Sequence, residues 1–163
     1  MLIGIFWVNK VFGSHPVKIN LSSKIVYGDL LQEYADKRDI PVELLIAIQI
    51  RETGFMQKYD RTTAVSPAGA IGIMQVMSYH TTNFGLPKRA LFDPETNIMI
   101  SSAIVKDNFV LYKGNIEKTL AAYNGGTKQA NLLQTQRCKE TRHYVSNAMK
   151  TIRYLQANTW VCE

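Results

Sequence analysis

Helical spacing of apolar residues, interrupted by Gly, Pro and Asp, is the feature that most restricts the fold of this chain. In most segments, apolar residues recur three and four positions apart, as they do on the buried face of an amphipathic helix. Runs that alternate apolar and polar residues, as strands do, are rare. The pattern therefore predicts a mainly α fold, with at most a small β-hairpin around residues 56–66.

Start and stop signals divide this pattern into helices. Asp93-Pro94-Glu95 combines an N-cap, a first-turn proline and an acid at the positive end of the helix dipole. Similar signals predict helices that begin after Ser23, at Pro41, near Ala70, after Ser78, after Asp93, after Asn115 and near Lys139. The expected stops are Gly54, Gly85, Gly114 and Gly125-Gly126.

The length of 163 residues suits one well-cored domain and is short for two. A content of 46% apolar and 20% charged residues is typical of globular domains and excludes wholesale disorder. No apolar run reaches the roughly 18 residues of a membrane span. We expect a single domain over residues 21–163, preceded by an extension over residues 1–20. The apolar start of that extension suits a signal remnant, a membrane-touching tail or an added strand, and we favour packing against the domain.

The net charge of +6 suits an anionic polymer such as nucleic acid, an acidic cell wall or a membrane surface. No basic stripe interleaved with aromatic residues is present, so no nucleic-acid partner is expected. Cys138 and Cys162 either pair or remain free thiols, and neither lies in a zinc-ligand spacing. The three histidines also lack such a spacing, so we expect no metal and no cofactor.

Glu52 is the first candidate for chemistry. On a helix it shares a face with Ile48 and Gln49, which points at a core. Partial burial would raise the pKa of the carboxyl towards the range of a general acid. The alternative is that the last turn places Glu52 in water or in an ion pair with Arg51, and for an isolated helix this alternative is favoured.

Five motifs between residues 52 and 145 change that balance. They are Glu52-Thr53-Gly54-Phe55, Ser66-Pro67-Ala68-Gly69-Ala70-Ile71-Gly72-Ile73-Met74-Gln75-Val76-Met77, Asp93-Pro94-Glu95-Thr96-Asn97-Ile98, Ala121-Ala122-Tyr123-Asn124-Gly125-Gly126 and Glu140-Thr141-Arg142-His143-Tyr144-Val145. In this order they resemble the motifs of the lytic transglycosylases, whose catalytic domain has a lysozyme-like fold of the glycoside hydrolase family 23 type. Thr53, Ile73 and Gly125 depart from the usual Ser, Leu and Ala of that pattern.

The resemblance implies a single lysozyme-like α-helical domain that cleaves the β-1,4 bond between N-acetylmuramic acid and N-acetylglucosamine in peptidoglycan. Glu52 would act first as acid and then as base, and the product would carry a 1,6-anhydro ring. Asp60 is a conceivable second carboxylate, but a solvated loop acid is the favoured interpretation. Such an enzyme would work in the periplasm, in the cell envelope or in a phage virion. The small size suits a secretion, conjugation or phage-entry machine.

The same resemblance implies a set of substrate-binding residues. Gln75 would read N-acetyl and hydroxyl groups, Met74 would form a sugar platform, and Ser66 would orient an acetamido group. Tyr123 would place its hydroxyl near the catalytic carboxyl. Structural roles compete with each of these, such as tying a loop, filling the core or capping a helix. The full expected set is Thr53, Ser66, Met74, Gln75, Ile98, Tyr123, Asn124, Glu140 and Tyr144.

Two other classes of function are compatible with the sequence, a hydrolase and a non-catalytic module. A goose-type lysozyme-like hydrolase would cut the same bond and leave a reducing end. A non-catalytic component of a virion or secretion complex, or a basic nucleic-acid binder, would need no acid at Glu52. The joint presence of Glu52, Gln75, Tyr123 and Glu140 favours an enzyme.

Overall fold

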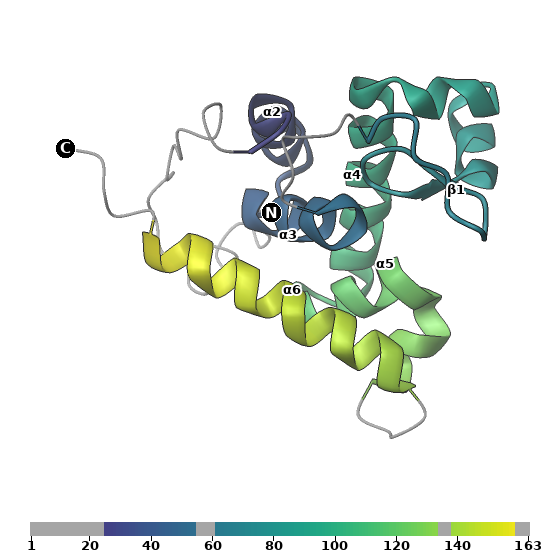
Figure 1. Cartoon of the computed structure of the whole chain (residues 1–163). Helices are drawn as coiled ribbons and strands as arrows, with labels where there is room; N and C mark the ends of the chain where they lie inside the picture. The colour runs from purple at the N-terminus through teal and green to yellow at the C-terminus, as the bar shows by residue number, and fades with distance from the viewer. Residues whose placement is uncertain (1–24, 55–60, 134–137, 159–163) are drawn as a thin grey trace, which may run out of the picture.

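A computed structural model describes residues 25–54, 61–133 and 138–158, and confirms the mainly α fold (Figure 1). The elements along the chain are α2 (Gly28–Arg38), α3 (Val42–Thr53), β1 (Ala70–Ile71), β2 (Val76–Met77), the 3₁₀ segments η1 (Ser78–Phe84) and η2 (Lys88–Phe92), α4 (Pro94–Leu111), α5 (Ile116–Asn131) and α6 (Lys139–Asn158). The expected boundary at residue 20 lies outside the described residues, as does Cys162.

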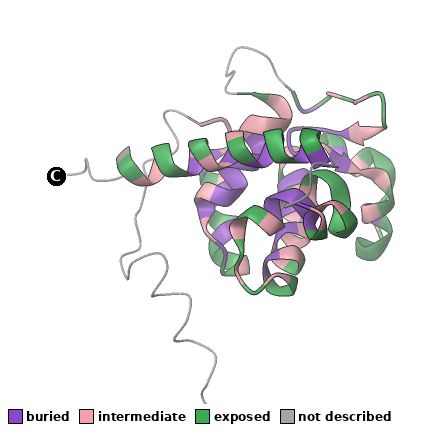
Figure 2. Cartoon of the chain, turned by 90° about the horizontal axis from the view of Figure 1, so that it is seen from below, coloured by how far each residue is buried: buried purple, intermediate pink, exposed green. Residues whose placement is uncertain are grey.

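Helix α3 is the centre of the molecule. Its residues Leu44 to Ile48 are completely buried, as expected of a helix that is apolar on nearly all sides. α6 packs along α3 and α5, while α4 packs against α2 and α5. Figure 2 shows the buried residues gathered where these helices face one another. The last turn of α3, which contains Glu52, is half-buried.

The expected capping signals are present in the structure. The Asp93 carboxylate accepts a hydrogen bond from the backbone N–H of Thr96 at 2.8 Å, so α4 begins at Pro94. The Asn115 side chain caps α5 in the same way, and Gly54 ends α3 with a φ of 84°. The first helix in the described residues, α2, begins at Gly28, and the expected cap at Ser23 lies outside them.

The expectation of a helix near Ala70 is wrong. Residues 70–77 form an antiparallel hairpin in which Ala70 pairs with Met77 and Ile71 with Val76. Gly72 and Gln75 both have positive φ values, 78° and 50°, which a right-handed helix does not contain. A hairpin is thus present, later in the chain than the expected residues 56–66, of which 55–60 lie outside the described residues. The segment after Ser78 is a 3₁₀ helix that Gly85 ends.

The region of α5 around Gly126 differs in part from expectation. Gly126 has φ 78° and ψ 172°, so the regular helix ends at the expected place. A second helical segment then continues to Asn131. The sequence did not predict this segment, because the glycine pair reads as the end of the helix. Gly125 lies close to α6, because a Cβ there would approach the Thr141 hydroxyl to 3.0 Å. The two glycines therefore combine a break in the helix with a close approach between helices.

The described residues contain neither a membrane-spanning helix nor a metal site. Within them, no helix has the length and apolar character that a membrane span needs. Within the same ranges, no three His, Cys, Asp or Glu side chains lie together as a metal site would require.

The buried thiol of Cys138 donates to the Leu132 carbonyl, 3.2 Å away.

Candidate active site

Glu52 lies in the last turn of α3, on the face that the sequence placed towards the core. Burial raises the pKa of its carboxyl above the ordinary value. A hydrogen bond from Tyr144 and the positive charge of Arg51 both lower this pKa, but they do not cancel the effect of burial. A carboxyl with a raised pKa is suited to donate a proton near neutral pH.

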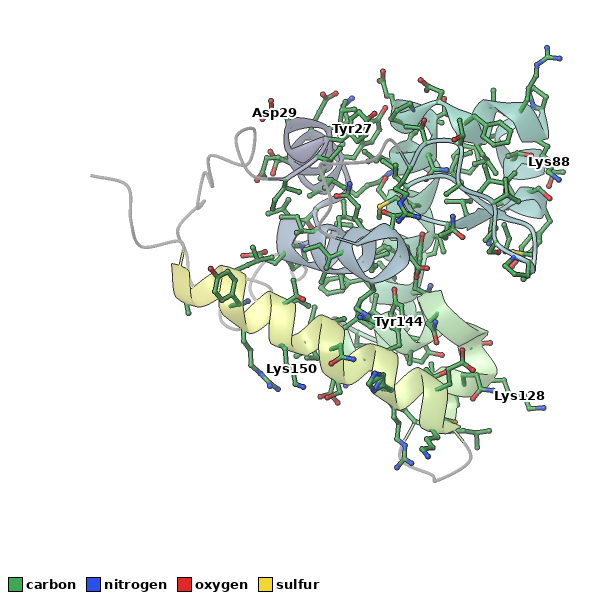
Figure 3. All side chains as sticks on the ribbon, viewed as in Figure 1. Tyr27, Asp29, Lys88, Lys128, Tyr144 and Lys150 are labelled. Carbon is green, nitrogen blue, oxygen red and sulfur yellow. The ribbon has the colours of Figure 1, made fainter. Side chains whose placement is uncertain are left out.

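The hydroxyl group that contacts Glu52 belongs to Tyr144 of α6. It donates to Glu52 Oε1 at 2.8 Å, and its side chain is buried. Figure 3 labels Tyr144, which extends from α6. Burial and the neighbouring Glu52 charge raise the pKa of Tyr144 well above its ordinary value, so its hydroxyl keeps its proton. The Arg51 guanidinium lies over the Tyr144 ring, 5.7 Å from the ring centre. These contacts join the ends of α3 and α6 around the carboxyl.

Tyr123 of α5 lies close to Glu52, but its hydroxyl donates a hydrogen bond to another group. Its hydroxyl donates to the Met74 carbonyl at 2.7 Å. Burial is the main cause that raises the pKa of Tyr123, and the negative charge of Glu52 adds to it. The family resemblance implied that the Tyr123 hydroxyl lies near the carboxyl, where it could donate a hydrogen bond to the acid. In the structure that bond comes from Tyr144.

The loop before and within the hairpin is tied together by its own side chains. Ser66 Oγ accepts from the backbone N–H of Ala70 at 3.0 Å. Gln75 Nε2 donates to the Gly72 carbonyl at 2.9 Å. Thr53 Oγ1 joins α3 to the same loop through the Ile73 carbonyl, 2.9 Å away. Ser66 and Gln75 thus take the structural roles that the sequence allowed.

The remaining expected residues differ in their access to solvent. Met74 and Ile98 are fully buried, so they support the site from behind. Asn124 and Glu140 are exposed, at the end of the regular part of α5 and in the first turn of α6. The structure thus brings Tyr144 and Tyr123 to Glu52, with Thr53 beside it in α3 and Met74 bonded to Tyr123.

Sequence reasoning assigned no role to Asn97. Its amide is fully buried and makes three hydrogen bonds to the hairpin and the segment before α4. The signal in the sequence was an amide placed just before the buried Ile98 in an apolar helix, where a polar side chain requires partners. Arg51 was considered only as an ion-pair partner of Glu52, whereas it also contacts Tyr144.

Comparison with known families gives a match over most of the chain. The profile of the family described as "Transglycosylase SLT domain" matches residues 29–145. The soluble lytic murein transglycosylase of Escherichia coli K12 is 33% identical over 110 residues, which are 63% of this chain and 16% of that protein. A transglycosylase of Enterobacteria phage PRD1 is 35% identical over 99 residues, or 61% of this chain and 34% of that protein. The chain thus spans about a third of the length of one of these relatives and less of the other.

Solved structures show the same fold. The 70 kDa soluble lytic transglycosylase of Escherichia coli is 27% identical, with a TM-score of 0.70 over 81% of this chain and 24% of its own. The lytic transglycosylase Slt of Pseudomonas aeruginosa, solved as an inactive Glu-to-Gln mutant, is 25% identical, with a TM-score of 0.66 over 79% of this chain and 24% of its own.

Proposed function

This chain belongs to the transglycosylase SLT domain family, and from that premise we propose that it is a peptidoglycan lytic transglycosylase. The bond that it cuts is the β-1,4 link between N-acetylmuramic acid and N-acetylglucosamine. The observation that carries this proposal is Glu52, a partly buried acid with a raised pKa that one tyrosine hydroxyl contacts. Such a group can protonate the oxygen of a leaving sugar.

The proposed reaction uses Glu52 twice. The carboxyl first gives its proton to the glycosidic oxygen, and the bond from that oxygen to C1 of the muramyl residue breaks. The resulting carboxylate then takes the proton of the muramyl 6-hydroxyl, whose oxygen bonds to C1 and closes the 1,6-anhydro ring. Glu52 is protonated again at the end, and no water is consumed. The reaction therefore needs one carboxyl group and no cofactor.

The surroundings of Glu52 support a mechanism with a single acid. The charged and hydroxyl groups that shift its pKa are Tyr144 and Arg51, and no second carboxylate from the described part of the chain is among them. Most glycosidases place two carboxyl groups about 5–9.5 Å apart around the sugar. Tyr144 takes the role of holding the carboxylate in place, because its hydroxyl keeps its proton and can donate throughout.

Substrate contacts are proposed for the polar groups around this acid. Gln75, Ser66 and Asn124 would bind acetamido and hydroxyl groups of the glycan, and Glu140 would line the outer part of the same surface. Thr53, Met74, Tyr123 and Ile98 would shape the wall behind the reacting sugar. Since peptidoglycan lies outside the cytoplasm, the protein would act in the cell envelope or as part of a phage particle, where a secretion, conjugation or entry machine could carry it.

Mass spectrometry of digested cell wall tests this function. We expect muropeptides that carry the 1,6-anhydro end, each lighter by one water than the corresponding hydrolysis product. Products with a reducing end and no anhydro form would show a lysozyme-like hydrolase instead. Binding to walls without any release of glycan would show a non-catalytic wall-binding component.

A further inference from the structure

The turn that connects β1 to β2 is attached to three helices by side chains. Each carbonyl group from residue 71 to residue 74 accepts a hydrogen bond from a side chain. The donors are Asn97 of α4 to Ile71, Gln75 to Gly72, Thr53 of α3 to Ile73, and Tyr123 of α5 to Met74. Since Glu52 precedes Thr53 in α3, this turn links the helix that carries the acid to the helix that carries Tyr123.

Asn97 fixes the position of the turn. Its Oδ1 accepts from the Met74 N–H at 2.9 Å, while its Nδ2 donates to the carbonyls of Ile71, at 2.9 Å, and Leu91, at 2.8 Å. All of these atoms are buried, where a lost hydrogen bond is costly. The amide also needs a glycine beside it, because a Cβ on Gly72 would lie 2.4 Å from Nδ2.

The position of the Met74 carbonyl determines which group accepts the hydrogen bond that Tyr123 donates. A phenol has one proton to donate, and Tyr123 donates it to the Met74 carbonyl at 2.7 Å. While that bond is made, Tyr123 cannot donate to Glu52. A hydrogen bond donated to a carboxylate stabilises its ionised form. The groups that face the Glu52 carboxyl are Tyr144 from α6, Tyr123 from α5 and Arg51 beside it in α3, and of the two phenols only Tyr144 donates to it.

We propose that Asn97 is a positioning residue for the acid: by holding the Met74 backbone, it keeps the Tyr123 hydroxyl donating to Met74 and leaves Tyr144 as the one phenol that donates to the Glu52 carboxyl. Asn97 has no contact with Glu52 and acts through Met74 and Tyr123. This inference rests on the proposed function, because it concerns the acid that the proposed reaction uses.

The variant Asn97→Leu tests the proposal, since Leu has a similar volume, makes no hydrogen bond and does not titrate. With soluble glycan strands as substrate, we expect kcat to fall by roughly 10- to 100-fold, as misplaced catalytic groups commonly cause, and KM to change by less than about twofold. The alkaline limb of the kcat/KM profile should move to lower pH, because a released Tyr123 hydroxyl can donate to the Glu52 carboxylate.

The matched control is Ser102→Ala. Ser102 is also fully buried in α4, but its hydroxyl donates to the Met99 carbonyl within its own helix. We expect this variant to have a slightly lower melting temperature and to keep the parent kcat and pH profile. If Asn97→Leu does not fold, Asn97→Ser replaces it with the same expected shift. In the Tyr123→Phe background, substitution of Asn97 should no longer move the alkaline limb.

Three results separate this inference from the function on which it rests. An active parent, an inactive Glu52→Gln variant and an unmoved alkaline limb in Asn97→Leu, with only its melting temperature lowered, would refute the positioning role alone. A limb that still moves when Tyr123→Phe is present would also refute it, because the effect would not pass through Tyr123. A parent that releases no anhydro product would refute the proposed function and this inference with it.

Discussion

At the scale of single residues, the chemistry of Glu52 depends on which hydroxyl donates to it. Tyr144 donates to the carboxylate and lowers its pKa, whereas Tyr123 donates to Met74. Burial raises the pKa of both phenols well above the ordinary value, so both keep their protons. The two tyrosines therefore contribute differently to the acid, although both lie close to it.

The variant Tyr144→Phe tests this division. Loss of the hydroxyl removes a donor to the carboxylate, so the pKa of Glu52 should rise further and the alkaline limb of kcat/KM should move to higher pH. We expect kcat to fall roughly tenfold, since the acid remains but is held less well. The pH–rate profile measures both effects.

The direction of this shift is opposite to that expected for Asn97→Leu. A limb that moves to lower pH in Tyr144→Phe would contradict the assigned donor. A useful comparison is Tyr154→Phe, which changes an exposed tyrosine on the same helix and should leave the limb in place.

The sequence could place Glu52 on a buried face, because helical periodicity relates residues a few positions apart. It could not identify the donor to the carboxyl. Tyr144 lies 92 positions away from Glu52, and only the packing of α6 on α3 brings the two together. The role of Asn97 could not be predicted either, because it bonds to backbone atoms of a turn that the sequence had assigned to a helix.

At the scale of elements, the hairpin turn depends on Gly72. This residue has φ 78°, and a Cβ would lie 2.4 Å from Asn97 Nδ2 and 2.7 Å from the Leu91 carbonyl oxygen. The variant Gly72→Ala should therefore combine backbone strain with a clash against buried atoms. We expect a loss of roughly 2–4 kcal/mol in the free energy of unfolding, measured by urea denaturation.

Gly69→Ala is the matched control for that measurement. Gly69 also has a positive φ, 86°, but no heavy atom would lie within 4 Å of its Cβ. Only the backbone strain of about 1 kcal/mol should then appear. Equal losses in the two variants would contradict the close packing of Asn97 against the turn.

The helices were easier to predict than this hairpin. Asp93 and Asn115 cap α4 and α5 through contacts with residues three positions ahead, so the sequence contains the whole signal. The hairpin has strands of two residues each, too short to show alternation. Its turn requires the positive φ of Gln75, which is unusual for a residue other than glycine.

At the scale of the whole molecule, the buried acid affects stability. The pKa of Glu52 is raised in the folded state, so the native protein binds this proton more tightly than the unfolded chain does. The contribution of this group to stability is thus complete below the unfolded pKa, and is lost as pH rises through the folded pKa. Above the folded pKa, the ionised carboxyl makes the fold less stable than a neutral side chain would.

Thermal unfolding of Glu52→Gln across pH tests this coupling. We expect the variant to be more stable than the parent at neutral pH, because the amide avoids burial of a charge and still accepts from Tyr144. The difference should shrink as the pH falls below the ordinary value of 4.5. A difference that does not depend on pH would contradict the raised pKa.

The most direct test of the account is the release of anhydro-muropeptides from purified cell wall by Glu52→Gln beside the parent. Loss of general acid catalysis should reduce the rate by at least about 100-fold. Glu43→Gln, at the other end of the same helix, should match the parent, and unfolding curves should show that both variants are folded. Release of anhydro product by Glu52→Gln at the rate of the parent would show that Glu52 is not the acid.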